Sequence, residues 1–249
     1  MQQDLSPPPL SLLADAALFL DFDGTLVDLA DTPDAVMVDS ALAAIVARLA
    51  ARLDGRIAIV SGRPVDEIQS LFGQRQLIIS GSHGLEIALP DGTRHDAERP
   101  AVLDRIIAEM DAFAADKPGL LVETKPLGAA LHYRRAPDYA GDSIALATRL
   151  AGETGLHLQT GKMMIEIRVP GADKGTAIDR LMTMTAMTGH RPLFLGDDDT
   201  DEPAMIAATA HGGCGILIGE PRDTAAAWRL PSVAAARQWL TRAVEEVAA

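Results

Sequence analysis

The chain has 249 residues, of which 48% are hydrophobic and 23% charged, and its formal net charge is −13. This composition is ordinary for a globular protein with a sizeable core, and the length suits a core domain with a second domain inserted into it. The negative charge argues against a nucleic-acid surface, which needs a basic footprint. The single cysteine, Cys214, excludes an internal disulfide framework and fits a reducing compartment.

The amino-terminal stretch lacks the features of an export or membrane segment. Residues 1–9 contain Asp4 and no lysine or arginine, so the basic region of a secretory signal is missing. Residues 10–20 are interrupted by Ser11 and Asp15 and are too short to span a bilayer. We therefore expect a cytoplasmic protein without membrane association.

Short apolar runs predict the strands of a buried sheet. They lack the alternation of half-exposed strands, which is typical of parallel strands covered on both faces. Helical repeats lie between them, one of them over residues 42–49 with apolar side chains at i, i+3, i+4 and i+7. Strands alternating with helices indicate an α/β fold with a doubly wound parallel sheet, as in Rossmann-like domains. The runs are residues 17–20, 57–60, 77–79, 193–195 and 216–218.

The middle of the chain has a different rhythm and predicts a separate α+β domain. Strand patterns come there in pairs joined by turns, with amphipathic helices between the pairs, which describes a small open sheet with helices on one face. We expect this inserted domain over residues 85–170, a core of residues 1–84 and 171–249, and a final helix over residues 228–247. The expected strands of the insert are residues 85–89, 120–125, 129–135, 156–159 and 163–169, and its helices are residues 102–113 and 138–153.

Two carboxylates follow the first apolar run. Asp21 and Asp23 are two positions apart, so on an extended chain they project to the same side, and Gly24 turns the chain directly afterwards. Two like charges at one point are stable only with a cation between them or a shared proton. The motif therefore predicts a divalent-metal site with a carboxylate that can react, although a solvated acidic turn fits the motif alone equally well.

These two residues suggest a phosphoryl-transfer reaction. Asp21 is the expected nucleophile, because a carboxylate can attack phosphorus and form an aspartyl-phosphate. Asp23 is placed to protonate the leaving oxygen and then to deprotonate the attacking water.

The second predicted strand ends in Ser61-Gly62-Arg63. The Ser61 hydroxyl can hydrogen-bond a phosphoryl oxygen, with help from the backbone N–H groups of the turn; the alternative is a helix N-cap ahead of Pro64. Arg63 can steer a phosphate, or it can form an ion pair with the acids at the start of the following helix.

The last parts of the expected site lie after the insert. Lys174 precedes a predicted helix, where an ammonium can orient the nucleophile and neutralise phosphoryl charge, whereas an isolated lysine is usually solvated. A run of acids begins at Asp197, directly after an apolar strand. We expect Asp197 to bind Mg²⁺ together with Asp21 and Asp23, and Asp198 and Asp201 to act through water or by holding Lys174.

Four ordered strings resemble the motifs of the haloacid dehalogenase superfamily of phosphatases, and the insert resembles its C2-type cap. Finer strings resemble the trehalose-6-phosphate phosphatases, among them Ser82-His83-Gly84 and the continuation of the last motif to Glu202. The resemblance implies Mg²⁺-dependent hydrolysis of trehalose 6-phosphate to trehalose and phosphate, the second step of trehalose synthesis, and functional association with a trehalose-6-phosphate synthase. The four strings are Asp21-Phe22-Asp23-Gly24-Thr25, Ser61-Gly62-Arg63, Lys174 and Gly196-Asp197-Asp198-Asp199-Thr200-Asp201.

The insert must recognise the sugar, and hydroxyl-rich ligands need side chains that accept and donate hydrogen bonds. In strand alternation Glu123 shares a face with Lys125, and His132 shares one with Arg134. Glu166 shares a face with Arg168, for which a salt-bridged sheet face is the alternative. The resemblance implies that a glutamate and a lysine of the cap bind the glucose hydroxyls. His83, flanked by Gly81 and Gly84, is expected to be a hinge or core histidine or a substrate contact. The full set of expected substrate-binding residues is Arg63, His83, Glu123, Lys125, His132, Arg134 and Glu166.

Other functions stay open. The same chemistry can act on sucrose phosphate, a mannosyl-phosphoglycerate or a phosphohexose. A non-enzymatic phospho-accepting module also has an acidic pocket with a nearby lysine, but the large insert argues against the open acceptor face that such a module needs. For an enzyme, we expect closure of the cap to exclude water until the sugar is bound.

Overall fold

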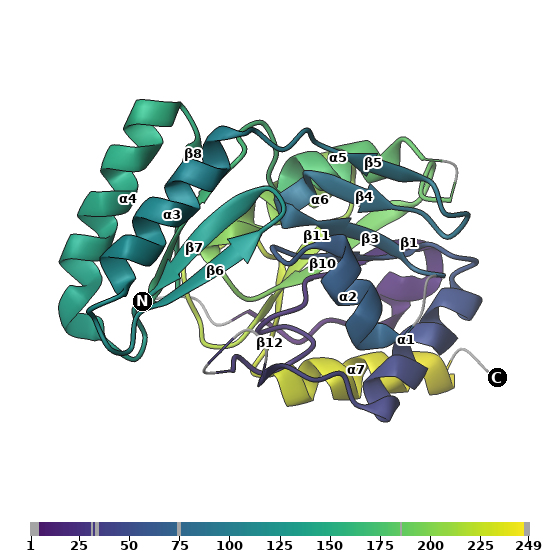
Figure 1. Cartoon of the computed structure of the whole chain (residues 1–249). Coiled ribbons are helices and arrows are strands. Elements are labelled where there is room, and N and C mark those ends of the chain that lie inside the picture. Colours follow the sequence, from purple (N-terminus) through teal and green to yellow (C-terminus); the bar gives the residue numbers. More distant parts are fainter. Residues whose placement is uncertain (1–4, 31, 33–34, 74–75, 185, 247–249) are drawn as a thin grey trace. The chain divides into compact units, whose positions relative to one another are not determined.

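The computed structural model describes residues 5–30, 32, 35–73, 76–184 and 186–246 (Figure 1). The chain forms two compact units. The core unit comprises Met1–His95 and Ala172–Ala249, and the insert unit comprises Asp96–Gly171. None of the helices in the described part of the chain is long and apolar enough to cross a membrane.

The core unit is built on an eight-stranded sheet in the order β12-β11-β10-β1-β2-β3-β4-β5. From β12 to β3 neighbouring strands run parallel, and β4 pairs antiparallel with β3. This arrangement confirms the expected α/β fold. The strands are β1 (Ala16–Leu20), β2 (Ile57–Val60), β3 (Ile78–Gly81), β4 (Glu86–Ala88), β5 (Arg94–Asp96), β10 (Arg191–Gly196), β11 (Cys214–Ile218) and β12 (Trp228–Leu230).

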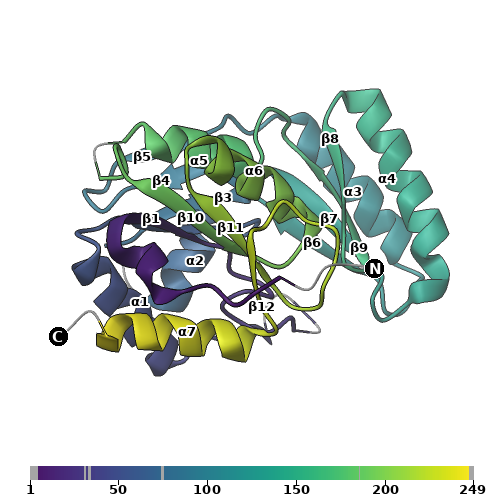
Figure 2. The same ribbon diagram turned by 180° about the vertical axis from the view of Figure 1, so that it is seen from behind.

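Helices cover both faces of this sheet (Figures 1 and 2). Successive residues of a strand point to opposite faces, so Leu18 and Leu20 join one apolar cluster while Ala17 and Phe19 join the other. Burial on both sides explains why the strands show no polar alternation. One face holds α1 (Ser40–Arg52), α2 (Val65–Phe72) and α7 (Val233–Glu246), and the other holds α5 (Lys174–Met182) and α6 (Glu202–Ala210).

Side-chain caps mark where two of these helices begin. The Asp39 carboxylate accepts a hydrogen bond of 2.7 Å from Leu42 N at the start of α1. Before α5, Asp173 and Thr176 form a reciprocal capping box, which fixes Lys174 as the first residue of the helix. Short 3-10 turns precede β1, follow β3 and precede α6: η1 (Leu10–Asp15), η3 (Ser82–Gly84) and η5 (Asp199–Asp201).

The insert unit is a four-stranded antiparallel sheet in the order β6-β7-β9-β8, with α3 and α4 packed on one face. The apolar side chains that face the helices include Leu131 of the sheet, Leu103 of α3 and Leu150 of α4, and all three are fully buried. The elements are α3 (Val102–Ala114), β6 (Leu121–Lys125), β7 (Gly128–His132), η4 (Pro137–Tyr139), α4 (Ala140–Thr154), β8 (His157–Gly161) and β9 (Met164–Arg168).

Three sequence predictions about these elements need correction. The hairpin expected to open the insert extends the core sheet instead, because Ile87 of β4 packs into the core cluster and pairs with Ser80 of β3. The compact insert unit therefore begins after residue 95 rather than at residue 85. Strand β7 ends at His132, so Arg134 lies in a turn closed by the Ala136 N to Tyr133 O hydrogen bond and not on the strand face. Trp228 belongs to strand β12, and the last helix begins only at Val233.

Candidate active site

The core unit gathers its chemically active side chains at the carboxyl ends of its parallel strands. Asp21 follows β1, Ser61 follows β2 and Asp197 follows β10, while Lys174 opens α5. The Asp21 N to Leu195 O hydrogen bond of 2.9 Å continues the pairing of β1 with β10 as far as the site. Neighbouring parallel strands end at one edge of the sheet, which is where ligands bind in open α/β folds.

Lys174 connects two carboxylates that are far apart in the sequence. Its Nζ lies 2.7 Å from Asp21 Oδ1 and 2.6 Å from Asp201 Oδ1. All three side chains are at most 5% exposed. The expected meeting of Lys174 with the first and last motifs is therefore present in the structure, and Asp201 is the residue that holds Lys174 with Asp21.

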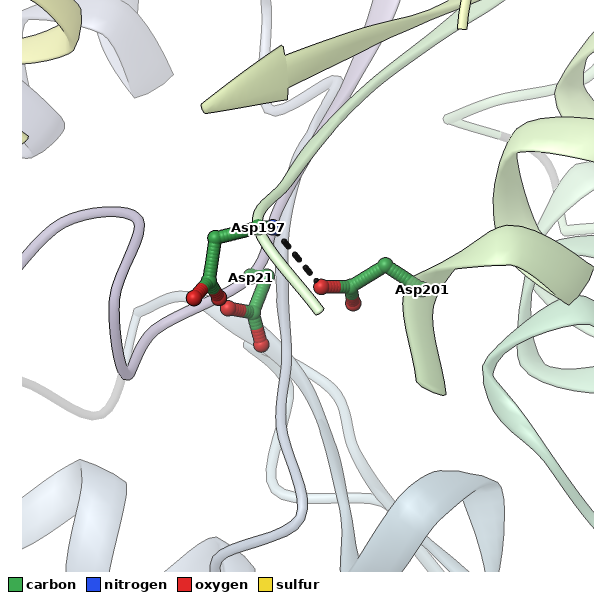
Figure 3. A group of neighbouring side chains, drawn as sticks. All are labelled: Asp21, Asp197 and Asp201. Carbon is green, nitrogen blue, oxygen red and sulfur yellow. Dashed lines mark hydrogen bonds between the residues drawn. The ribbon is translucent and has the colours of Figure 1, made fainter. Parts of the chain in front are cut away.

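Asp197 completes a cluster of three carboxylates. One oxygen each of Asp21, Asp197 and Asp201 lies within 4.8 Å of the other two (Figure 3). The second oxygen of Asp201 accepts hydrogen bonds of 2.9 Å from the backbone N–H groups of Asp197 and Asp198, the first of which is drawn in Figure 3. Asp201 therefore fixes the loop that presents Asp197.

Two glycines leave room for this cluster. Gly24 has a φ of +86°, and a Cβ atom there would lie 2.2 Å from Asp197 Oδ2. A Cβ atom at Gly196 would lie 2.5 Å from Asp201 Cγ. A larger residue at either position would displace a carboxylate, so the absence of a side chain is what lets the acids converge.

The electrostatics of the cluster favour an additional cation. Burial, together with Asp201, raises the pKa of Asp21 well above its ordinary value, against the lowering effect of Lys174. Burial lowers the pKa of Lys174, but Asp201 and Asp21 outweigh it and raise that pKa above its ordinary value, so the ammonium stays charged. The Lys174 ammonium pairs with two carboxylates of this cluster of three. Among the described residues, none donates a hydrogen bond to the buried Asp21 Oδ2.

Oxygen ligands, excess negative charge and an orphaned buried carboxylate oxygen together fit a hard divalent cation such as Mg²⁺. Asp21 and Asp197 are the residues of the cluster best placed to hold one, because the oxygens of Asp201 already bind Lys174 and two backbone N–H groups.

Asp23 lies outside this carboxylate cluster. Its two oxygens accept hydrogen bonds of 2.7 and 2.9 Å from Nε and Nη2 of Arg63. Arg63 also pairs with Glu67 of α2 and lies over the Phe22 ring. Burial lowers the pKa of Arg63, but the larger opposite effect of Asp23 and Glu67 raises this pKa above its ordinary value, so the guanidinium stays charged. The ion pair expected as the alternative for Arg63 is thus formed with Glu67, and the expected metal ligation by the Asp23 side chain stays a prediction.

Ser61 lies in the turn between β2 and α2. Its Oγ accepts a hydrogen bond of 3.0 Å from Arg63 N, and the side chain is buried. The alternative of a helix N-cap is wrong, because α2 begins at Val65 with Pro64 in the N-cap position. His83 is also buried and adopts a left-handed conformation with a φ of 56°. Its ring lies against Gly62, where a Cβ atom would be 2.5 Å from Nε2.

Four of the expected sugar-binding residues lie on the face of the insert sheet opposite α3 and α4, because the residues next to them along the strands, such as Leu131 and Ile167, pack against those helices. Glu123 Oε2 lies 2.7 Å from His132 Nε2, and Lys125 Nζ lies 3.0 Å from Glu166 Oε2. Burial raises the pKa of Glu123, but the hydrogen bond from His132 and the charge of Lys125 lower it below its ordinary value. These four residues form one polar patch. Arg134 stands apart in its turn, where Nη2 donates to Lys162 O at 3.3 Å.

Arg222 was not predicted from the sequence, although it binds the acidic loop that begins at Asp197. Its Nη2 donates a hydrogen bond of 2.9 Å to the carbonyl oxygen of Asp198, and its Nη1 pairs with Glu202. Glu202 also accepts hydrogen bonds from Thr224 Oγ1 at 2.8 Å and from the Ala225 backbone at 2.7 Å. Its position in the sequence could have indicated it, because the loop that contains Arg222 follows β11 and leaves the sheet at the same edge as the other motifs.

Comparisons with known proteins agree on one family. A family model described as Trehalose-phosphatase matches residues 19–234. The chain is 41% identical to a probable trehalose-phosphate phosphatase of Sinorhizobium fredii over 82% of this chain and 78% of the relative. It is 35% identical to trehalose-6-phosphate phosphatase of Escherichia coli over 96% and 90% of the two chains.

Solved structures of trehalose-6-phosphate phosphatases and a related protein have a similar fold. A crystal structure of a trehalose-6-phosphate phosphatase related protein superposes with a TM-score of 0.79 at 27% identity, covering 93% of this chain and 98% of that one. The C-terminal domain of C. albicans trehalose-6-phosphate phosphatase has a TM-score of 0.85 at 19% identity, covering 98% and 99%, and this likeness concerns the fold.

Proposed function

Because the chain belongs to the trehalose-phosphatase family, we propose that it hydrolyses trehalose 6-phosphate to trehalose and phosphate. The observation that carries this proposal is the buried contact of Lys174 with Asp21 and Asp201 beside Asp197. The contact joins motifs from both ends of the chain into one site for a phosphoryl group. The core unit acts as the catalytic domain of haloacid dehalogenase type, and the insert unit acts as a C2-type cap.

Asp21 is the nucleophile of the proposed reaction. Lys174 holds its Oδ1, which keeps the carboxylate in place and leaves Oδ2 without a donor among the described residues. An oxygen of Asp21 attacks phosphorus, and the bond between phosphorus and the sugar oxygen breaks. Water then attacks the aspartyl-phosphate, the bond from phosphorus to Asp21 breaks, and phosphate leaves.

Asp23 moves the protons of both steps. It gives a proton to the departing sugar oxygen and takes one from the attacking water. In the structure both of its oxygens are held by Arg63, so acid–base work by Asp23 requires that this pair open when substrate arrives. The released guanidinium of Arg63 and the Ser61 turn then bind the phosphoryl oxygens.

Mg²⁺ is the cofactor that we propose for this site. Asp21 and Asp197 would hold it, with Asp23 as the further ligand expected from the sequence. When bound, the ion would offset the negative charge of the transferring phosphoryl group. Lys174 contributes to the same end with a fixed ammonium, and the low exposure of the site strengthens both effects.

The polar patch of the insert unit supplies the sugar-binding groups in this proposal. Glu123, Lys125 and Glu166 offer both acceptors and donors for the hydroxyls of trehalose, and His132 lies beside them. Cytoplasmic location and association with a synthase stay predictions from the sequence.

A substrate panel tests the function. We expect phosphate release to be fastest, by specificity constant, with trehalose 6-phosphate, slower with sucrose phosphate, a mannosyl-phosphoglycerate and hexose phosphates, and absent without Mg²⁺. A higher specificity constant for another sugar phosphate would reassign the substrate and leave the chemistry in place.

The nucleophile is tested separately with Asp21→Asn. An amide cannot form the aspartyl-phosphate, so turnover should fall by about a thousandfold or more while the melting temperature stays close to that of the wild type. Asp111→Asn, at an exposed residue of α3, is the matched control and should be fully active. Full activity of the Asp21 variant would end the proposed mechanism.

A further inference from the structure

The turn after β3 contains an unusual run of backbone conformations. Ser82, His83 and Gly84 have φ values of 48°, 56° and 97°, so three consecutive residues are left-handed and two of them are not glycine. Such residues are strained and persist only where the surroundings fix them, which often happens near functional sites. The segment Ser82–Gly84 leaves the sheet at the same edge as Asp21, Ser61 and Asp197.

On one side the segment is tied to the Ser61–Arg63 turn by its backbone. Ser82 N donates a hydrogen bond of 2.9 Å to Arg63 O, and His83 N donates one of 3.0 Å to Ser61 O. Within the turn, Arg63 N donates to Ser61 Oγ at 3.0 Å. The conformation of the turn therefore depends on the position of the segment.

The imidazole of His83 takes the space beside Gly62. A Cβ atom at Gly62 would lie 2.5 Å from His83 Nε2 and 2.7 Å from Cε1, and Gly62 is not in a left-handed conformation. Gly62 is thus required by the histidine ring and not by its own backbone dihedrals. The two residues form a size-matched pair.

On its other side the segment packs against the start of α5. A Cβ atom at Gly84 would lie 2.8 Å from Asp173 O and 3.2 Å from Ala177 Cβ. Asp173 is the N-cap of the helix whose first residue is Lys174. The same three residues therefore abut both the Ser61 turn and the helix end that carries the site's lysine.

We propose that His83 is a positioning residue for phosphate binding. Its ring, held by the left-handed segment, presses on Gly62 and keeps the Ser61–Arg63 turn in the conformation that receives the phosphoryl group. This inference rests on the proposed function, because it assigns phosphate binding to that turn. It gives His83 a role other than contact with the sugar.

The first experiment compares His83→Ala and His83→Asn with the wild type, using trehalose 6-phosphate and p-nitrophenyl phosphate as substrates and inorganic phosphate as inhibitor. Asparagine tolerates a left-handed backbone, so the second variant removes the ring with less change in backbone strain. Both variants should lower kcat/KM by about tenfold or more for both substrates and weaken inhibition by phosphate by a similar factor. His211→Ala, which removes an exposed histidine of the same unit, should change neither.

The second experiment is a double-mutant cycle. Gly62→Ala alone should lower kcat/KM by about a hundredfold, because its methyl group meets the ring. In the His83→Ala background, where the ring is gone, the same substitution should cost less than about threefold. Gly152→Ala, at a helical glycine with open space around it, is the control.

Loss with the sugar phosphate alone would overturn the inference in favour of a sugar contact. A lower melting temperature with an unchanged phosphate inhibition constant would overturn it in favour of a purely structural role, and additive losses in the cycle would overturn the pairing with Gly62. Failure of the proposed function has a different signature. The wild type would then leave trehalose 6-phosphate intact while it still hydrolysed p-nitrophenyl phosphate and bound inorganic phosphate.

Discussion

The two carboxylate oxygens of Asp21 have different surroundings. Oδ1 is held at 2.7 Å by Lys174, whereas no described residue donates to Oδ2. A nucleophilic carboxylate benefits from this asymmetry, because one oxygen orients the group and the other stays available. Gly24 and Gly196 contribute to the site in another way, because they leave room for Asp197 and Asp201 beside Asp21.

Gly24→Ala tests that role of glycine. The new methyl group would meet Asp197 Oδ2 at 2.2 Å, and the backbone would also be strained at a φ of +86°. Gly55→Ala is the matched control, because Gly55 has a φ of +78° and nothing within 4 Å. Both variants should lose about 1–2 kcal/mol of unfolding free energy, but only Gly24→Ala should weaken Mg²⁺ binding, by about tenfold or more. Equal Mg²⁺ affinities, measured by calorimetry, would contradict the expectation.

The Glu123–His132 contact gives a stability effect that depends on pH. The pKa of Glu123 is lowered in the folded protein, so its ionised form adds stability above the unfolded value of about 4.3, and this stability is lost as pH falls through the folded pKa. The melting temperature of Glu123→Gln should therefore lie below that of the wild type near neutral pH, and the difference should shrink in acid. Glu98→Gln, at an exposed glutamate of the same unit, should show no such trend. A difference independent of pH would disprove the ionic origin.

At the scale of elements, the stability of helix α1 depends on the carboxylate of its N-cap residue, Asp39. Asp39 caps the helix through Leu42 N and also pairs with Arg237 of α7 at 2.7 Å. Asp39→Ala should lower the free energy of unfolding by about 1 kcal/mol in urea titrations. Asp39→Ser keeps a capping oxygen and loses only an exposed ion pair, so it should lower that free energy by at most about 0.5 kcal/mol. If serine were as damaging as alanine, the pair with Arg237 would be the larger contribution.

Elements buried on both faces could be predicted from the sequence. The apolar runs at β1, β2, β10 and β11 mark their strands closely, and the polar residues that follow them come together as parallel geometry requires. Short strands at the margin of the sheet could not be assigned in this way. The run at β4 reads equally well as part of the insert, because only its pairing with β3 shows to which sheet it belongs.

Side-chain partners were harder to predict than strand ends. From the sequence, Lys174 was expected to orient the nucleophile Asp21, and in the structure its Nζ lies 2.7 Å from Asp21 Oδ1. The sequence contained no sign that Arg63 would hold Asp23, since the i, i+2 spacing of Asp21 and Asp23 implies a shared direction and not a shared partner. A long flexible side chain such as that of arginine can pair with any of several nearby charges. Which pair forms depends on tertiary packing, which the spacing of residues in the sequence does not determine.

At the scale of the whole molecule, binding of the proposed Mg²⁺ should raise stability. The site holds three neighbouring carboxylates, two of them paired with Lys174, so a bound divalent ion would relieve repulsion among them. Mg²⁺ at about a hundred times its Kd should add about 2.7 kcal/mol to the free energy of unfolding and raise the melting temperature by several degrees, reversibly on chelation. Asp197→Asn should lose this shift, whereas Asp199→Asn, at an exposed acid of the same loop, should retain it. An equal shift in both variants would place the ion elsewhere.

The point at which the insert rejoins the core also bears on how such chains can be recombined. The chain returns through Gly171, whose φ is +98°, and Asp173 then caps the helix that starts with Lys174. If another protein's insert replaced residues 96–171, the new sequence would therefore end only a few residues before Lys174. A chimera that keeps residues 171–176 should keep the capping box, and with it the place of Lys174, whereas one that replaces Asp173 or Thr176 should not.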